Sequence, residues 1–241
     1  MKAISISLHV QKLTLPINYN TMLQGLIYSL LSSNEQLSAA VHDQGIMVNN
    51  RKYKLFCFTR LKGKSQMDEN RQITYTSDVS FEVRSAADVI IDTIAERLAE
   101  NAIIRIGNNI LKVASFTVFE KVILANSVNI RMIEPITVHS TLDDGSTYYY
   151  KPDEDAFYQQ VADNAYRKYV AYAMNTEIAP ITIYPIRVTP KNKVITRVKN
   201  LVVEAWHGTY HIEADPEIIS FLYYAGLGDR NSQGFGVFEI D

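Results

Sequence analysis

The stretch GLGDRNSQGFGVFEID, residues 226–241, places four of the ten glycines of the chain within eleven residues. A dinucleotide fingerprint of the form GxGxxG does not fit, because Asn231 stands where the third glycine belongs. Two interpretations remain. In the first, the stretch is a structural turn, since glycine, asparagine and aspartate accept a positive φ. In the second, it is a cradle for a phosphate backbone, in which free N–H groups bind anionic oxygens and Arg230, Ser232 and Gln233 add donors.

The composition is that of an ordinary core-forming protein, with 47% hydrophobic and 21% charged residues in 241. No apolar run approaches the roughly 18 residues of a membrane helix, and the first residues alternate in polarity like a strand. We therefore expect neither a transmembrane helix nor a signal peptide. Cys57 is the single cysteine and lies in the strand-like run KLFCF. This predicts a buried, reduced thiol and a cytoplasmic protein.

Charge is distributed unevenly along the chain, although the net charge is only −2. Segments 51–64 and 186–199 contain basic side chains and no acidic ones. The acidic residues gather in 88–100 and 143–155. A surface divided in this way can bind phosphates on one side without a high isoelectric point. The alternative is that both basic segments are solvated strand faces.

Hydrophobic periodicity predicts an α+β fold of two ferredoxin-like halves in tandem, 1–124 and 125–241. Leu23, Leu26, Ile27, Leu30 and Leu31 form one apolar stripe in the first helix. The expected order of elements is strand 2–9, helix 18–33, a short helix in 32–45, strands 52–61 and 79–84, helix 86–101 and strand 109–121, followed by strand 128–138, helix 153–174, strands 181–189, 193–206 and 209–213, helix 215–225 and strand 237–240.

Four segments together resemble the CRISPR-associated endoribonucleases that process precursor guide RNA, the sixth Cas family within the repeat-associated mysterious protein (RAMP) superfamily. The first is the terminal pattern of glycine, hydrophobe, glycine, five residues, glycine, hydrophobe, glycine. The others are LPINYNTMLQGLIYSLL at 15–31, and VHDQG followed by YKLFCFTRL at 53–61. The resemblance covers both ends of the chain. It implies two RRM-like, ferredoxin-type domains and cleavage of a CRISPR repeat RNA without a metal or other cofactor.

Cleavage of that kind needs a base for the 2′-hydroxyl, a cation for the phosphate and a group that steadies the leaving oxygen. The resemblance implies His42, Tyr28 and Lys54 as the catalytic set. Lys52 lies on the same strand face as Lys54 and could replace it. From the residues alone, His42 is equally well explained as a helix-end cap, Tyr28 as a packing residue and Lys54 as a solvent-facing strand residue.

We expect no catalytic role for the other four histidines. His9 and His139 lie in or beside strand patterns, which favours ordinary structural roles. His207 and His211 are four apart in a turn and strand and lack supporting cysteine or carboxylate spacing, so no metal site is expected.

RNA contacts are expected in two places. In relatives a basic hairpin holds the RNA near the base of a stem, and TPKNK at 189–193 has the composition of its tip. The expected RNA-binding residues are Gly226, Gly228, Arg230, Ser232, Gly234 and Gly236 in the glycine-rich stretch, and Lys191, Lys193, Arg197 and Lys199 in the hairpin. Gly228 and Gly234 are the positions where a side chain is expected to block the approach of an RNA backbone.

The leading functional hypothesis is therefore an endoribonuclease that acts on precursor crRNA. The first alternative is a non-catalytic RNA-binding subunit of the same superfamily, and the second is a phosphate-binding regulatory module. The expected partner is CRISPR repeat RNA, without a membrane. Association with an effector complex and formation of a homodimer stay open.

Overall fold

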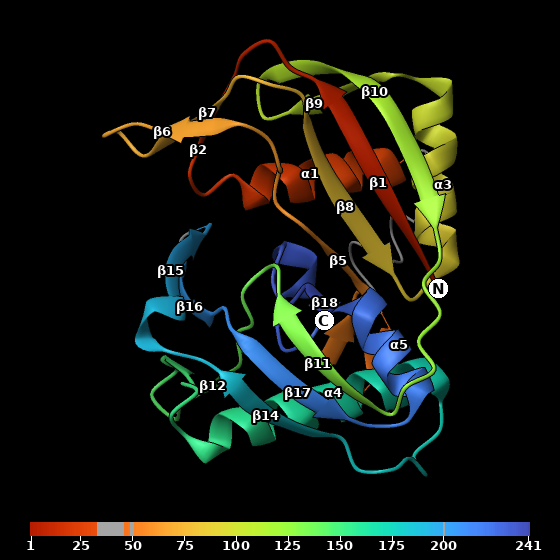
Figure 1. The fold of residues 1–241 in the computed structure, drawn as a ribbon, viewed down its shortest axis with the longest axis vertical. Coiled ribbons are helices and arrows are strands. Elements are labelled where there is room, and N and C mark those ends of the chain that lie inside the picture. The colour runs from red at the N-terminus through yellow and green to blue at the C-terminus, as the bar shows by residue number, and fades with distance from the viewer. Residues whose placement is uncertain (33–45, 49–50, 200) are drawn as a thin grey trace.

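Five antiparallel strands form the amino-terminal sheet, in the order β5-β8-β1-β10-β9 (Figure 1). The computed structural model describes residues 1–32, 46–48, 51–199 and 201–241. Helices α1 and α3 pack over this sheet, as expected for a ferredoxin-like unit with one added edge strand. The elements are β1 (Lys2–His9), α1 (Asn20–Leu31), β5 (Phe56–Phe58), β8 (Val79–Ser85), α3 (Asp88–Glu100), β9 (Ile103–Ile106) and β10 (Asn109–Phe119).

The apolar stripe predicted in the first helix is confirmed, since all five of its leucine and isoleucine residues are buried in α1. Smaller elements surround the unit. They are the sheet of β2 (Leu13–Pro16), β7 (Gln72–Tyr75) and β6 (Ser65–Met67), and the pair β3 (Ile46–Val48) and β4 (Arg51–Tyr53). The short helix expected over 32–45 lies outside the described residues, apart from Ser32.

The second unit repeats the ferredoxin-like topology, with the strand order β14-β17-β11-β18. Two hairpins are added to it. Its elements are β11 (Ser127–Met132), β12 (His139–Thr141), β13 (Thr147–Tyr149), α4 (Asp155–Ala173), β14 (Thr182–Arg187), the 3₁₀ turn η2 (Pro190–Asn192), β15 (Lys193–Val198), β16 (Leu201–Trp206), β17 (Thr209–Glu213), α5 (Pro216–Ala225), the 3₁₀ turn η3 (Asn231–Gln233) and β18 (Phe238–Ile240).

The link between the units runs from the end of β10 at Phe119 to the start of β11 at Ser127, and the proposed boundary at 124–125 falls within it. None of the helices in the described part of the chain has the length and hydropathy that crossing a bilayer requires.

Two expected strands are wrong. The strand expected over 52–61 is interrupted, because Leu55 takes a left-handed φ of 47° between β4 and β5. The strand expected over 193–206 is instead a hairpin of β15 and β16, and Lys199 at its turn has a φ of 55°.

The TPKNK segment is not the tip of that hairpin. Pro190 opens a 3₁₀ turn there, and the Asn192 side chain accepts hydrogen bonds from the backbone N–H and hydroxyl of Thr189 at 2.8 and 2.9 Å. This local capping holds residues 189–192 as a connection between β14 and β15. The hairpin itself lies against the first unit, where Thr196 donates to the Asn18 side chain at 2.9 Å.

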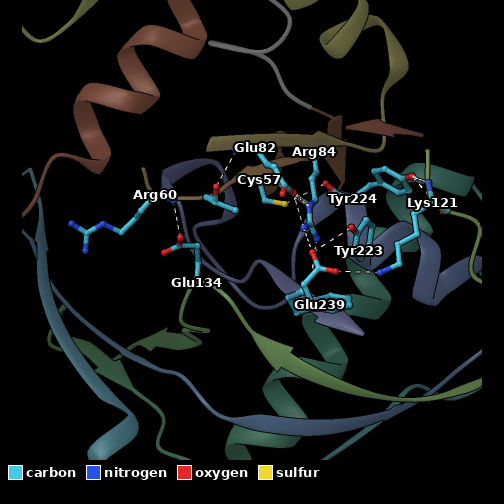
Figure 2. Close-up of polar contacts among 11 residues, drawn as sticks. Cys57, Arg60, Glu82, Arg84, Lys121, Glu134, Tyr223, Tyr224 and Glu239 are labelled. Atoms are coloured by element: carbon cyan, nitrogen blue, oxygen red, sulfur yellow. Dashed lines mark hydrogen bonds and ion pairs between the residues drawn. The ribbon is translucent and has the colours of Figure 1, made fainter. Parts of the chain in front are cut away.

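Buried charges join the two units (Figure 2). The Arg84 guanidinium, 1% exposed, donates to the Phe238 carbonyl at 2.8 Å and pairs with the carboxylates of Glu82 and Glu239. It also lies 4.0 Å from the centre of the Tyr223 ring. The contacts compensate for the loss of hydration of a buried cation. They fix the edge of the second sheet against β8.

The Cys57 thiol is fully buried at the same junction, as the sequence predicts. It donates to the Tyr224 carbonyl across the two units at 3.5 Å. Burial raises the pKa of this thiol to about 12, which keeps it protonated and unreactive at neutral pH.

Glu134 predicts a pH dependence of stability. Burial raises the pKa of this carboxyl to about 7, although the Arg60 N–H donates to it at 2.7 Å. Between its ordinary pKa and about 7, the folded state therefore holds a proton that the unfolded state has released, so the free energy of unfolding falls as pH rises. Glu134→Gln keeps the acceptor and cannot ionise. We expect it to be more stable than the parent at pH 8 by on the order of 3 kcal/mol, and nearly equal at pH 4.5.

Urea unfolding of both proteins at the two pH values measures this difference, and titrating groups elsewhere cancel in the comparison. A gap of the same size at both values would contradict the prediction.

Candidate functional site

The glycine-rich loop, residues 226–236, is folded back on itself between the units. Gly226, Gly228, Gly234 and Gly236 all have φ between 71° and 83°, and all are buried. Arg230 is also left-handed, with φ at 59°. These values agree with the structural-turn interpretation, because such a backbone strains any residue that has a Cβ.

The space beside the glycines is occupied by protein. A Cβ on Gly228 would come within 2.7 Å of the Thr137 carbonyl oxygen, and one on Gly234 within 2.7 Å of the Asn20 side chain. Packing within the protein therefore already requires glycine at these two positions. Contact between RNA and the other groups of the loop remains a proposal.

Lys168 holds this loop from α4. Its Nζ donates to the carbonyls of Gly226 and Gly228 at 2.5 and 3.1 Å and to the side chain of Asn231 at 2.9 Å. Burial lowers the pKa of Lys168 to about 8, against the opposing effect of the nearby Asp229 carboxylate. Sequence reasoning missed Lys168. The sequence did hold one indication, because this lysine lies on the same helical face as the apolar residues Val161 and Ala165. A cation on a buried face is tolerated only when hydrogen-bond acceptors surround it.

One face of α1 also binds the glycine-rich loop through hydrogen bonds. Gln24 donates to the Ser232 carbonyl at 2.6 Å, and Asn20 donates to the Gln233 carbonyl at 3.3 Å. Tyr28 follows at the same four-residue spacing and so continues this face. The first unit thus places Tyr28 next to the loop contributed by the second.

Tyr28 and Lys54, two of the three expected catalytic residues, are in direct contact. The Lys54 ammonium donates to the Tyr28 hydroxyl at 2.6 Å and lies 4.8 Å from the ring centre. The Tyr28 ring packs edge-on against Phe56, with centres 6.1 Å apart. His42, the third expected residue, lies outside the described residues, as does the side chain of Lys52.

A cavity of about 430 Å³ opens beside Lys54 between the units. The loop supplies Arg230 and Ser232 to its wall, and the second unit adds His139. The Arg230 guanidinium donates to Tyr149 and Gln233, both at 3.3 Å. Two cations, Lys54 and Arg230, therefore meet at one cavity from opposite units, an arrangement suited to a phosphate.

His139, for which a structural role was expected, lies at the same cavity. Its ring nitrogen Nδ1 lies 2.8 Å from an Asp229 carboxylate oxygen at this cavity. The two residues are 90 positions apart, so no local pattern could have paired them. In the part of the chain that the structure describes, no group of three or more histidine, cysteine or carboxylate residues could hold a metal ion.

The four expected hairpin cations do not have equal surroundings. Lys193 pairs with the Glu204 carboxylate at 2.6 Å. Lys191, Arg197 and Lys199 are exposed. Lys191 lies on η2, beside a second hollow that Arg131 and Arg187 also line.

Two ferredoxin-like units meet at a glycine-rich loop and a cationic cavity, as expected of a phosphate-binding protein. Comparison with known families identifies the family. Residues 119–240 match the family model described as CRISPR associated protein Cas6, C-terminal. The chain belongs to the Cas6 family.

Whole-chain comparisons agree. The chain is 27% identical over 235 residues to a Methanocaldococcus jannaschii protein named CRISPR-associated endoribonuclease Cas6 1, covering 92% of this chain and 86% of that one. A solved structure titled as a Cas6-related gene from Pyrococcus furiosus has a TM-score of 0.84 at 20% identity, covering 99% and 98% of the two chains. Another, titled as a RAMP protein binding different RNA substrates, has a TM-score of 0.82 at 18% identity and covers both chains completely, at 100% each.

Proposed function

We propose that this protein is an endoribonuclease that cleaves CRISPR repeat RNA within precursor crRNA to produce guide RNAs. The observation that carries the proposal is the hydrogen-bonded pair of Lys54 and Tyr28 at a cavity that Arg230 enters from the other unit. Family membership and the names of the relatives support it. Because the fold alone fixes no activity, the proposal rests on this site.

The proposed reaction uses the 2′-hydroxyl of the RNA as the nucleophile and needs no metal. His42 removes the proton of the hydroxyl, which then attacks the adjacent phosphorus. Lys54 stabilises the negative charge that develops on the phosphate oxygens, and Arg230 adds a second cation. Tyr28 accepts a hydrogen bond from Lys54 and so orients its ammonium. The products are a 2′,3′-cyclic phosphate and a 5′-hydroxyl.

RNA binding is proposed to use both ends of the second unit. Arg230 and Ser232 contact the strand at the cavity, with the loop glycines holding them in place. Arg197 and Lys199 on the β15–β16 hairpin and Lys191 on the preceding η2 turn contact phosphates, with Lys193 less available because of Glu204. We place the reaction in the cytoplasm. Retention in an effector complex and formation of a homodimer are left to experiment.

Incubation of the protein with end-labelled repeat RNA in EDTA tests the function. We expect one internal cut and a 5′ product whose 3′ end resists ligation until its cyclic phosphate is removed. Binding without a cut would favour a non-catalytic RNA-binding subunit.

The hairpin cations are expected to act through phosphates. Replacing Lys191 and Arg197 together with alanine should weaken repeat binding and reduce the slope of log affinity against log salt by up to about two units. Lys193→Ala is the matched control, since Glu204 already neutralises that ammonium and the slope should barely change. Filter binding over a salt series measures both. Equal slopes in all three proteins would contradict the prediction.

A further inference from the structure

His139 and Asp229 form a hydrogen-bonded unit at the rim of the cavity that Lys54 lines. The backbone N–H of His139 donates to the Asp229 carboxylate at 3.1 Å, and Nδ1 of the same residue lies 2.8 Å from it. Asn164 donates to the other carboxylate oxygen at 2.6 Å. The carboxylate is thus held on both sides, and the imidazole lies in close contact with it.

The arrangement selects which ring nitrogen can exchange a proton with a ligand. Burial alone would raise the pKa of Asp229, but the contacts with His139 and the charge of Lys168 outweigh it and hold the pKa below its usual value. An ionised carboxylate beside Nδ1 favours a proton on that nitrogen. Among the residues that the structure describes, none hydrogen-bonds to Nε2. The imidazole is 27% exposed, so Nε2 is the nitrogen left to exchange a proton with a ligand.

The other charged groups at the cavity are less suited to donating a proton. Arg230 does not deprotonate in proteins, and Lys168 is committed to three acceptors of the loop. Lys54 is held by the Tyr28 hydroxyl. The Tyr149 ring packs beside the imidazole, with ring centres 5.6 Å apart. An imidazole changes its charge between about pH 5 and 8, which suits it to proton transfer.

We propose that His139 is the general acid of the cleavage, with Asp229 as its positioning residue. The inference rests on the endoribonuclease function proposed above. As the 2′ oxygen forms its bond to phosphorus, the bond from phosphorus to the 5′ oxygen breaks. The imidazolium transfers its Nε2 proton to that oxygen, giving the 5′-hydroxyl. The neutral imidazole then recovers a proton from water, and no oxidant or co-reactant is required.

A substrate with sulfur in place of the 5′ bridging oxygen tests the role directly, because a thiolate leaves without being protonated. We expect His139→Ala to slow single-turnover cleavage of the ordinary repeat by about 10²–10³-fold. Cleavage of the sulfur-containing repeat should fall less than about fivefold. The same variant is thus its own folding control, because misfolding would slow both reactions. Equal losses on the two substrates, or the parent rate on both, would overturn the proposal.

Asp229→Asn should give a smaller loss with the same recovery on the sulfur-containing repeat, since it acts on the reaction through the orientation of His139. If the parent protein does not cut the ordinary repeat, the proposed function itself fails, and this result is separate from those above.

Discussion

Replacing His42 with alanine is expected to slow cleavage of the repeat by about 10²–10⁴-fold, the usual contribution of a general base. Affinity for the RNA should change little, because the hairpin cations and Arg230 supply most of the attraction for phosphate. Single-turnover cleavage at saturating protein measures the rate apart from binding. EDTA should have no effect on the parent rate.

His9→Ala is the control for this variant. His9 is 58% exposed at the end of β1 and pairs with Asp78 at 3.1 Å, so its loss should leave the rate unchanged. The parent rate should also rise with pH on the acidic side as His42 loses its proton, and the rise should disappear in His42→Ala. A His42 variant that cuts at the parental rate would contradict the assignment and leave Tyr28 and Lys54 to be tested for the base.

Much of the fold could be predicted from periodicity. The stripe from Leu23 to Leu31 repeats at helical spacing, and every member is buried in α1. The alternation of strands and helices indicated two ferredoxin-like units, which the sheet orders confirm. The predicted burial of Cys57 is also confirmed. These features depend on residues close together in the chain, where sequence pattern is most informative.

The wrong strand and hairpin predictions come from backbone conformations that the amino-acid composition does not predict. Leu55 has a left-handed backbone although it is a branched residue, and its carbonyl accepts from the Ala86 N–H at 3.0 Å and from Ser85. The tertiary contact outweighs the local strand preference of the run around it. In the TPKNK segment, proline favoured a hairpin tip, but the Thr189 and Asn192 side chains closed a 3₁₀ turn instead.

Part of the candidate site was predictable from the family resemblance. It implied Tyr28 and Lys54, and the hydrogen bond between them brings together two of the expected residues. The partnership of His139 with Asp229 and the role of Lys168 were not predictable, because each joins segments at least 58 residues apart. Whether a buried polar residue has hydrogen-bond partners can be seen only in the folded structure, where segments distant in sequence come together.

Gly236→Ala is expected to cause the largest loss of stability of any single methyl group added to the loop. The new Cβ would overlap the Leu227 carbonyl oxygen and crowd the Asn231 side chain, at a φ of 74° that L-residues rarely adopt. Leu227 cannot retreat easily, because its N–H donates to the Gly236 carbonyl at 2.8 Å. Backbone strain and overlap together should cost roughly 4 kcal/mol and lower the melting temperature by about 10 °C.

Gly145→Ala separates the two causes of that loss. Gly145 has a φ of 81°, but a Cβ there meets no atom within 4 Å, so only backbone strain of about 1 kcal/mol remains. Thermal unfolding of both variants, followed by repeat binding below their melting temperatures, distinguishes packing from ligand contact. If Gly236→Ala melted together with Gly145→Ala yet lost its affinity for RNA, Gly236 would serve the ligand and the phosphate-cradle interpretation would return. A large drop in melting temperature, with affinity kept by the folded fraction, would show that the glycine is required by the packing that presents Arg230 to the cavity.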